Sequence, residues 1–257
     1  MKQNELIRKL GSIFPIASQD FWDFSGWQLG TKDPEKEIRK IYLCLDFSEF
    51  CKDSLLEFSP DIVITHHPFY FGTRRKVCLG DPKKEELSTW FEDLGISLYS
   101  YHTPFDKGKD GMNESLLRLI GFDSFTKGED PYIRTVKLDN RIPLSALVER
   151  IRDSLGFESL DYFDNTGGEV SSFSILAGSG ANYFGTAIEC GSECYVSGDS
   201  KLNNRLDMSR YGISFIELPH EAEEKGFLYG MKNALLKIDP TFEIYGYAYE
   251  MKNRRSL

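Results

Sequence analysis

The chain has 257 residues, and its 31 basic and 40 acidic side chains give a net charge of −9. A chain of this length buries about 70–75% of the surface of its unfolded state, so it needs neither disulfides nor a metal merely to fold. The acidic balance argues against sequence-independent binding of nucleic acid, which depends on clustered Lys and Arg. A short basic run, 252–255, is interpreted as a solvated end of the chain.

No segment has the pattern of a signal peptide or a membrane span. Near the start, Leu6, Ile7, Leu10 and Ile13 recur at helical spacing with charges between them, unlike the continuous apolar core of a signal peptide. A stretch without charges, 171–188, is too rich in Gly and Ser to span a bilayer. We therefore expect no membrane partner.

The five cysteines form no CxxC pair, and their odd number does not suggest a disulfide framework. The spacing of Cys190 and Cys194 would allow metal binding, but small buried or partly buried thiols are the preferred interpretation. We expect a protein of the reducing cytoplasm.

In the first half of the chain, short apolar runs alternate with amphipathic segments. The apolar runs predict strands at 41–45, 61–65 and 96–100. The amphipathic segments predict helices at 50–58, 83–94 and 114–120. The last of these is expected to be capped by Asn113. Alternation in this order is typical of parallel βαβ units with helices covering the sheet.

The second half repeats the pattern beyond a stretch of Gly, Asp and Pro at 127–131, the best candidate boundary. Strands are expected at 132–138, 173–176, 194–196 and 213–218, and helices at 144–155, 183–188 and 202–211. We predict an α/β fold with two α/β domains, whose mixed sheets are flanked by helices. The first domain is expected to span 1–128 plus 230–257, and the second 129–229.

All four histidines stand just past predicted strands. His66 and His67 follow the second strand, His102 follows the third, and His220 follows the strand at 213–218. Open α/β sheets bind ligands beside the carboxyl ends of their strands. The histidines are therefore the candidate functional residues.

The spacing of these residues favours metal binding. In a strand, His66 and His67 would point to opposite faces and could reach different metals. A helix starting at the proline before His220 would place His220 and Glu224 at positions i and i+4 on one face. With Asp106 added, the set of imidazoles and carboxylates suits Zn²⁺, Fe²⁺, Mn²⁺ or Ni²⁺. Five ligands exceed the usual three-residue catalytic zinc site and indicate two metals.

Each residue also has a structural explanation. A histidine after a strand is more often hydrogen-bonded than metal-bound, and His102 fits this description best. Asp106 could simply organise its turn, and the run 220–224 could be a solvated helix start, since acidic residues favour the first turn. The cluster as a whole favours the metal site over these single-residue explanations.

Three motifs span the chain in order: THHPFYF at 65–71, YHTPFD at 101–106, and His220 with Glu224. Supporting matches are Trp22-Asp23, Leu45-Asp46, Gly178 with Gly180, and Ser197-Gly198-Asp199. Together they resemble the NIF-three-like family, whose members are known as GTP cyclohydrolase 1 type 2 homologues. The length leaves no room for the inserted domain of the longer members. The sequence departs from the family's pattern at several positions, among them Phe24, Pro219 and Glu223.

The resemblance implies a dinuclear metal site in the cleft between two α/β domains, and a toroidal homohexamer built as a trimer of dimers. When this sequence is matched to the family's motifs position by position, the resemblance implies five ligands for two divalent ions: His66, His67, Asp106, His220 and Glu224. It places His102 close to the site as the candidate catalytic residue, and Asp46 and Asp199 at its mouth.

Two functional hypotheses follow. The first is a metal-dependent hydrolase of a small nucleotide-like or phosphorylated substrate, GTP cyclohydrolase 1 type 2-like by resemblance, in which two metals activate water and His102 moves a proton. The second is a non-enzymatic, metal-binding hexamer with a regulatory or adaptor role. The expected partners are further copies of the chain and a small molecule. The glycine segment 178–181 is either a phosphate cradle at a helix N-terminus or a tight packing turn.

Overall fold

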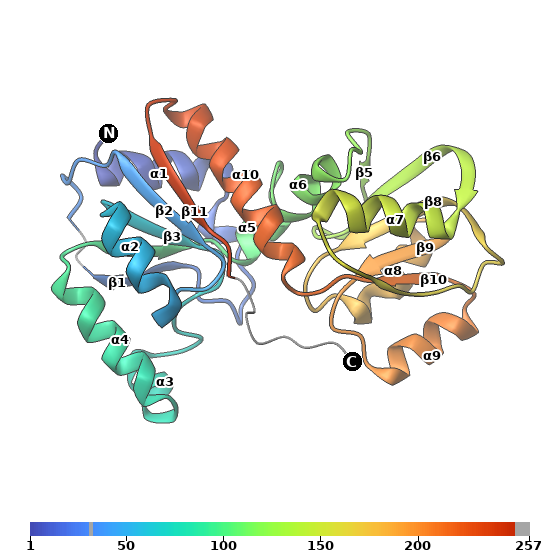
Figure 1. Cartoon of the computed structure of the whole chain (residues 1–257), viewed down its shortest axis with the longest axis horizontal. Helices are drawn as coiled ribbons and strands as arrows, with labels where there is room; N and C mark the ends of the chain where they lie inside the picture. Colours follow the sequence, from blue (N-terminus) through green and yellow to red (C-terminus); the bar gives the residue numbers. More distant parts are fainter. Residues whose placement is uncertain (31–32, 250–257) are drawn as a thin grey trace. The chain divides into compact units, whose positions relative to one another are not determined.

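The structure is a computed structural model that describes residues 1–30 and 33–249, so the basic run at 252–255 lies outside the described residues. The chain divides into two compact units, which we call unit 1 (Met1–Lys109 with Phe227–Leu257) and unit 2 (Asp110–Gly226). Each unit is built on one mixed sheet with helices beside it (Figure 1). The predicted α/β fold with two mixed sheets is confirmed.

Within the described residues, the sheet of unit 1 has five strands in the order β1-β4-β3-β2-β11. Their bounds are β1 Gly26–Gly30, β2 Lys40–Cys44, β3 Ile62–Thr65, β4 Ser97–Ser100 and β11 Glu243–Tyr247. Neighbouring strands from β4 to β11 are parallel, whereas β1 is antiparallel to β4. All residues of β3 and β4 are buried, as expected for parallel strands covered on both faces.

The helices of unit 1 lie before, between and after these strands along the chain. They are α1 Gln3–Ile13, α2 Lys52–Phe58, α3 Arg74–Gly80, α4 Pro82–Asp93 and α5 Thr103–Lys107, with short 3₁₀ turns at Ile16–Ser18 and Glu49–Cys51. Helix α4 begins where Asp81 caps the backbone N–H groups of Lys83 and Lys84 and Pro82 fits the first turn. Helix α10, Ala222–Ile238, belongs to unit 1 from Phe227 onward.

The described sheet of unit 2 has six strands in the order β5-β6-β8-β9-β10-β7. Its strands are β5 Thr126–Lys127, β6 Arg134–Pro143, β7 Asp161–Phe163, β8 Glu169–Leu176, β9 Cys194–Ser197 and β10 Ser214–Glu217. Strands β8, β9 and β10 are parallel, and the outer strands are antiparallel to their neighbours. The helices are α6 Met112–Leu119, α7 Leu144–Leu155, α8 Phe184–Glu189 and α9 Leu202–Arg210, with a 3₁₀ turn at Ala181–Tyr183.

The chain enters unit 2 at residue 110, whereas the sequence suggested a boundary at 128/129. Helix α6 causes the difference, because the Asn113 side chain donates to Tyr132 O (3.1 Å) and accepts from Ala177 N (2.8 Å). A buried ion pair between Glu114 and Arg134 (2.9 Å) adds to this attachment. The expectation that Asn113 caps this helix is wrong, since the N-cap is Gly111.

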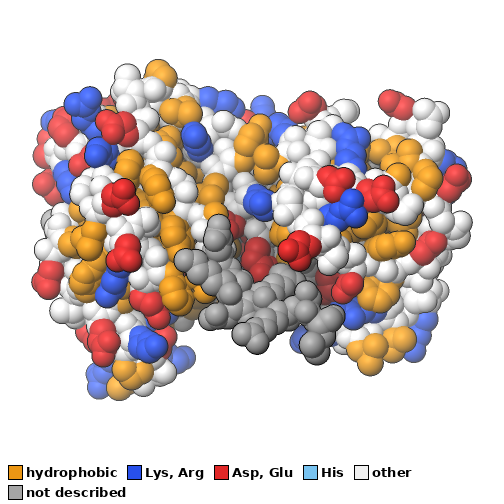
Figure 2. Space-filling model, viewed as in Figure 1, with side chains coloured by type: hydrophobic (Ala, Val, Ile, Leu, Met, Phe, Trp, Pro, Cys, Tyr) orange, Lys and Arg blue, Asp and Glu red, His pale blue; other side chains and the backbone are white. Residues whose placement is uncertain are grey.

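Three further features bear on function. In the part of the chain that the structure describes, no helix combines the length and apolarity that a membrane crossing requires. On the face shown in Figure 2, acidic and basic side chains are interspersed over each unit. Cys194 is a buried free thiol and Cys190 a half-buried one, which agrees with their interpretation as packing residues.

Candidate metal centre

The first ligand group forms where β3 ends. Strand pairing stops at Thr65, and the chain bends at His66 and His67. The Thr65 hydroxyl donates to the backbone oxygen of His67 (2.8 Å), which holds the bend. The ring centroids of His66 and His67 therefore lie only 4.9 Å apart. The expectation that the two imidazoles point to opposite faces is wrong, because the strand ends before the first of them.

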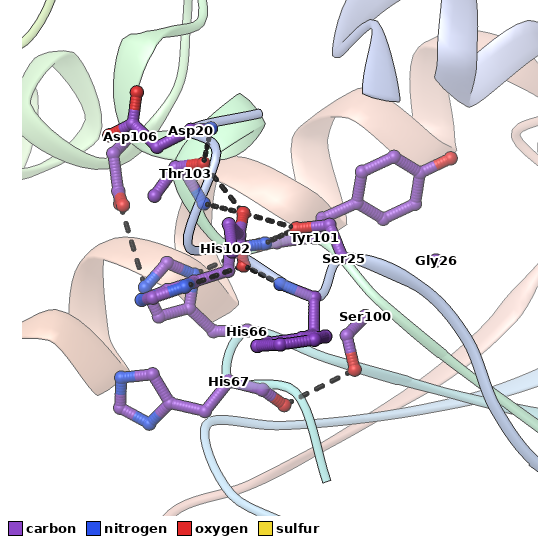
Figure 3. A network of polar contacts seen from close by, with 12 residues as sticks. Asp20, Ser25, Gly26, His66, His67, Ser100, Tyr101, His102, Thr103 and Asp106 are labelled. Carbon is purple, nitrogen blue, oxygen red and sulfur yellow. Dashed lines mark hydrogen bonds and ion pairs between the residues drawn. The ribbon is translucent and has the colours of Figure 1, made fainter. Parts of the chain in front are cut away.

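His102 joins these two rings from the next strand. It stands at the N-terminus of α5, two residues beyond the end of β4. Its ring centroid lies 5.1 Å from that of His66 and 5.4 Å from that of His67. One nitrogen from each ring can be chosen so that the three atoms lie within 4.8 Å of one another. The three side chains come together in Figure 3 and could hold a metal ion.

Asp106 brings a carboxylate to the same group. It lies in α5, where its backbone N–H donates to His102 O (3.2 Å). Its Oδ1 is 3.5 Å from Nε2 of His66, whose side chain is 1% exposed. The four residues that the sequence singled out in this unit are therefore assembled at one place (Figure 3). The sequence did not predict the five-residue helix that carries Asp106.

The hydrogen bonds of the rings indicate which nitrogens could bind metal. His66 Nδ1 faces the carbonyl oxygen of Tyr101 (3.0 Å), and His67 Nδ1 faces Asp46 Oδ2 (2.8 Å). Because a carbonyl oxygen or a carboxylate only accepts, each Nδ1 carries the hydrogen. The lone pair is then on Nε2, the arrangement typical of metal-binding histidines.

Asp23 performs the same role for His102, and sequence analysis did not assign it a role. Its Oδ1 lies 3.0 Å from His102 Nδ1. The two residues are separated by 79 positions, so no local spacing connects them. The only signal was the Trp22-Asp23 pair among the motif matches.

Unit 2 contains a second group around His220. Its Nε2 lies 2.9 Å from Glu223 Oε2, and its Nδ1 lies 2.9 Å from Asp199 Oδ2. The hydrogen bond with Glu223 raises the pKa of His220 to about 9, and Asp199 adds to this effect while burial opposes it. In the metal-free protein at neutral pH, this imidazole is therefore a cation between two carboxylates.

The local geometry at His220 differs from the expected one. Pro219 O accepts from Ala222 N (2.9 Å) and His220 O from Glu223 N (3.0 Å), so the proline opens a turn and α10 begins at Ala222. The predicted helical i, i+4 relation of His220 and Glu224 is therefore wrong. Glu224 lies buried in the first turn of α10. Glu223, three residues after His220, is the carboxylate that the prediction missed.

The glycine segment is a tight packing turn. Gly178 has a φ of +71°, and a Cβ there would lie 2.2 Å from Glu223 Oε1. A Cβ on Gly180 would lie 2.6 Å from Ser197 Oγ. Ser179 donates to the carboxylate of Asp199 (2.5 Å). The close contacts of both glycines support the packing turn, one of the two interpretations left open.

Unit 1 carries three imidazoles and unit 2 one, each with a carboxylate nearby and each just beyond a strand end, which makes the chain a candidate metalloprotein. The Duf34/NIF3 (NGG1p interacting factor 3) family model matches residues 1–253. The chain therefore belongs to this family, and the resemblance found in its motifs is confirmed.

Relatives and solved structures agree with this assignment. The chain is 27% identical over 227 residues to the GTP cyclohydrolase 1 type 2 homolog of Clostridium perfringens, with 86% of each chain covered. It is 29% identical over 225 residues to the GTP cyclohydrolase 1 type 2 of Helicobacter pylori strain 26695, with 87% of each covered. A Bacillus cereus protein related to NIF3 superposes with a TM-score of 0.86 at 15% identity, covering 100% of this chain and 99% of that one. Staphylococcus aureus protein SA1388 has a TM-score of 0.82 at 19% identity, with coverage of 100% and 99%.

Proposed function

We propose that the protein binds divalent metal ions and uses them to hydrolyse a small nucleotide-like or phosphorylated substrate. The observation that carries the proposal is the gathering of His66, His67 and His102, with nitrogens within 4.8 Å of one another. Each ring turns its Nδ1 toward an acceptor, which leaves Nε2 as its possible metal ligand. Neutral imidazoles are the form that binds metal.

The proposed ligands for two ions per chain lie in both units: His66, His67, Asp106, His220 and Glu224. Imidazole and carboxylate ligands suit Zn²⁺, Fe²⁺, Mn²⁺ or Ni²⁺. Bound there, such ions would supply Lewis acidity, which makes water a stronger acid and stabilises developing negative charge. Glu223 is a further candidate carboxylate, because it already contacts Nε2 of His220.

The chain's own residues supply proton handling and orientation. His102 is proposed to accept or return a proton at Nε2, because its Nδ1 is already engaged with Asp23. The names of the Clostridium and Helicobacter relatives support a nucleotide-like substrate.

The test is a hydrolysis screen of nucleotides and phosphoesters with the full chain, metal-depleted and reloaded with zinc, manganese or iron. We expect turnover that requires metal, is lost in His67→Ala, and is unchanged in Glu189→Ala, which alters an exposed glutamate of α8. A metal-loaded protein with no turnover on any of these substrates would contradict the hydrolase and favour the regulatory or adaptor role.

A further inference from the structure

We propose that Asp23 is a positioning residue that fixes His102 in the tautomer with hydrogen on Nδ1, so that Nε2 keeps its lone pair. The inference deepens the proposed function and rests on it for the use made of Nε2. The tautomer itself is a property of the metal-free chain and can be tested there.

The Asp23 carboxylate is fully enclosed and accepts five hydrogen bonds. Oδ1 accepts from Phe24 N (2.6 Å) and His102 Nδ1 (3.0 Å). Oδ2 accepts from the Ser25 hydroxyl (2.8 Å) and from both the backbone N–H (3.1 Å) and the hydroxyl (2.6 Å) of Thr103. The side chain is 0% exposed. This number of donors indicates a site built for a carboxylate rather than a chance contact.

The Asp23 carboxylate is ionised at neutral pH. Burial alone would raise the pKa of Asp23, but the hydrogen bonds from His102, Thr103 and Ser25 outweigh it and hold that pKa well below its usual range. An ionised carboxylate can only accept hydrogen bonds. A His102 ring with its lone pair on Nδ1 would therefore face Asp23 Oδ1 lone pair to lone pair, and that tautomer is disfavoured.

Both the backbone and the ring of His102 are held in place. The backbone N–H of His102 donates to the Ser25 hydroxyl (3.0 Å), which itself donates to Asp23. The rings of Trp22 and Phe71 each lie edge-on to His102 with centroids 5.6 Å away. Ser25 and His102 lie side by side in Figure 3. Asp23 thus acts through His102 and sets which nitrogen is available.

The other carboxylate–histidine pair of unit 1 provides a contrast. Asp46 contacts His67 at a similar distance, 2.8 Å, but its side chain is 64% exposed. Water can replace Asp46 as the acceptor. At the enclosed Asp23 no such replacement is available without rearrangement, so the effect on the tautomer is expected to be larger there.

The experiment is a long-range ¹H–¹⁵N correlation spectrum of the imidazoles in metal-free, ¹⁵N-labelled full chain, at a pH where His102 is neutral. His102 is assigned from the signals that disappear in His102→Gln. In the unmodified chain we expect protonated Nδ1 and unprotonated Nε2. The opposite pattern would overturn the proposal without any need for a further variant.

Asp23→Asn is the decisive variant. Three donors converge on Oδ2, against two on Oδ1, so the asparagine oxygen should occupy the Oδ2 position and turn the NH₂ group toward His102 Nδ1. We expect the major tautomer to switch to the one with hydrogen on Nε2. Ser25→Ala, which loosens the same turn but keeps the carboxylate, should leave the tautomer unchanged.

A folded Asp23→Asn protein with an unchanged tautomer would contradict the proposal, and so would a switch in Ser25→Ala. These outcomes do not depend on metal. A confirmed tautomer in a chain that binds no metal would therefore contradict the proposed function and not this inference.

Discussion

Asp46 and His67 show how a residue outside the proposed ligand set can affect metal binding. Asp46 accepts from Nδ1 of His67 and so orients the ring and increases the basicity of Nε2. Loss of such a partner typically lowers metal affinity about 10–100-fold. Since Asp46 is largely exposed, we expect the lower end of that range.

The corresponding prediction concerns Asp46→Asn. Zinc affinity, measured by competition with a chromophoric chelator, should fall about 10-fold in this variant. Asp53→Asn, which alters an exposed carboxylate of α2, serves as the control and should bind like the parent. Equal affinities in all three proteins would show that Asp46 does not support His67.

The lowered pKa of Asp23 also implies that the free energy of unfolding depends on pH. Its pKa in the folded state is held below the usual value of about 3.9, so between the two values the unfolded state binds more protons. The stabilisation is therefore present above about pH 4 and is lost as the pH falls further. Urea unfolding should show Asp23→Asn less stable than the parent at pH 7, with a smaller difference at pH 3. A difference in stability between the two proteins that grows as the pH falls would contradict this prediction.

The sequence predicted the residues of unit 1 that come together, but not their arrangement. Residue types after successive strands were sufficient to choose His66, His67, His102 and Asp106. The bend at the first two histidines depends on the hydroxyl of Thr65, which a period-two pattern does not reveal. Asp23 was missed because its contact with His102 crosses 79 positions.

At the scale of elements, the turn around Gly178 controls the position of Glu223. A methyl group on Gly178 would meet the Glu223 carboxylate at 2.2 Å, while the same substitution at Gly191, with a φ of +76°, meets nothing within 4 Å. Both changes place a side chain on a left-handed backbone and should destabilise unit 2 by more than about 1 kcal/mol. Only the first also displaces Glu223.

Gly178→Ala should therefore lower the pKa of His220 from about 9 toward its ordinary value of 6.5, because the hydrogen bond that His220 donates to Glu223 is the main cause of the raised pKa. Gly191→Ala should leave that pKa unchanged. NMR titration of the metal-free proteins measures both. Equal pKa values in the two variants would mean that the Gly178 turn does not set the position of Glu223.

Strands were predictable from the sequence where burial is complete. The apolar runs that predicted β2, β3 and β4 lie in parallel strands covered on both faces. Strand β1 was missed because it lies at the sheet edge and begins and ends with glycine. The helix α5 has only five residues, and a segment this short has no periodicity to detect.

At the scale of the whole molecule, the family assignment leads to a prediction about assembly. By resemblance we expect a homohexamer, so light scattering on the full chain should give a mass near six times 29.4 kDa. A monomer at micromolar concentration would contradict the ring.

We propose that the imidazoles and carboxylates of this chain bind metal. The measurement that decides this is metal content by plasma mass spectrometry, on protein purified without chelator or histidine tag. We expect close to two divalent ions per chain, with less metal in folded His67→Ala and Glu224→Ala and no change in Glu189→Ala. A chain without metal, even after reconstitution with zinc, manganese and iron, would contradict it.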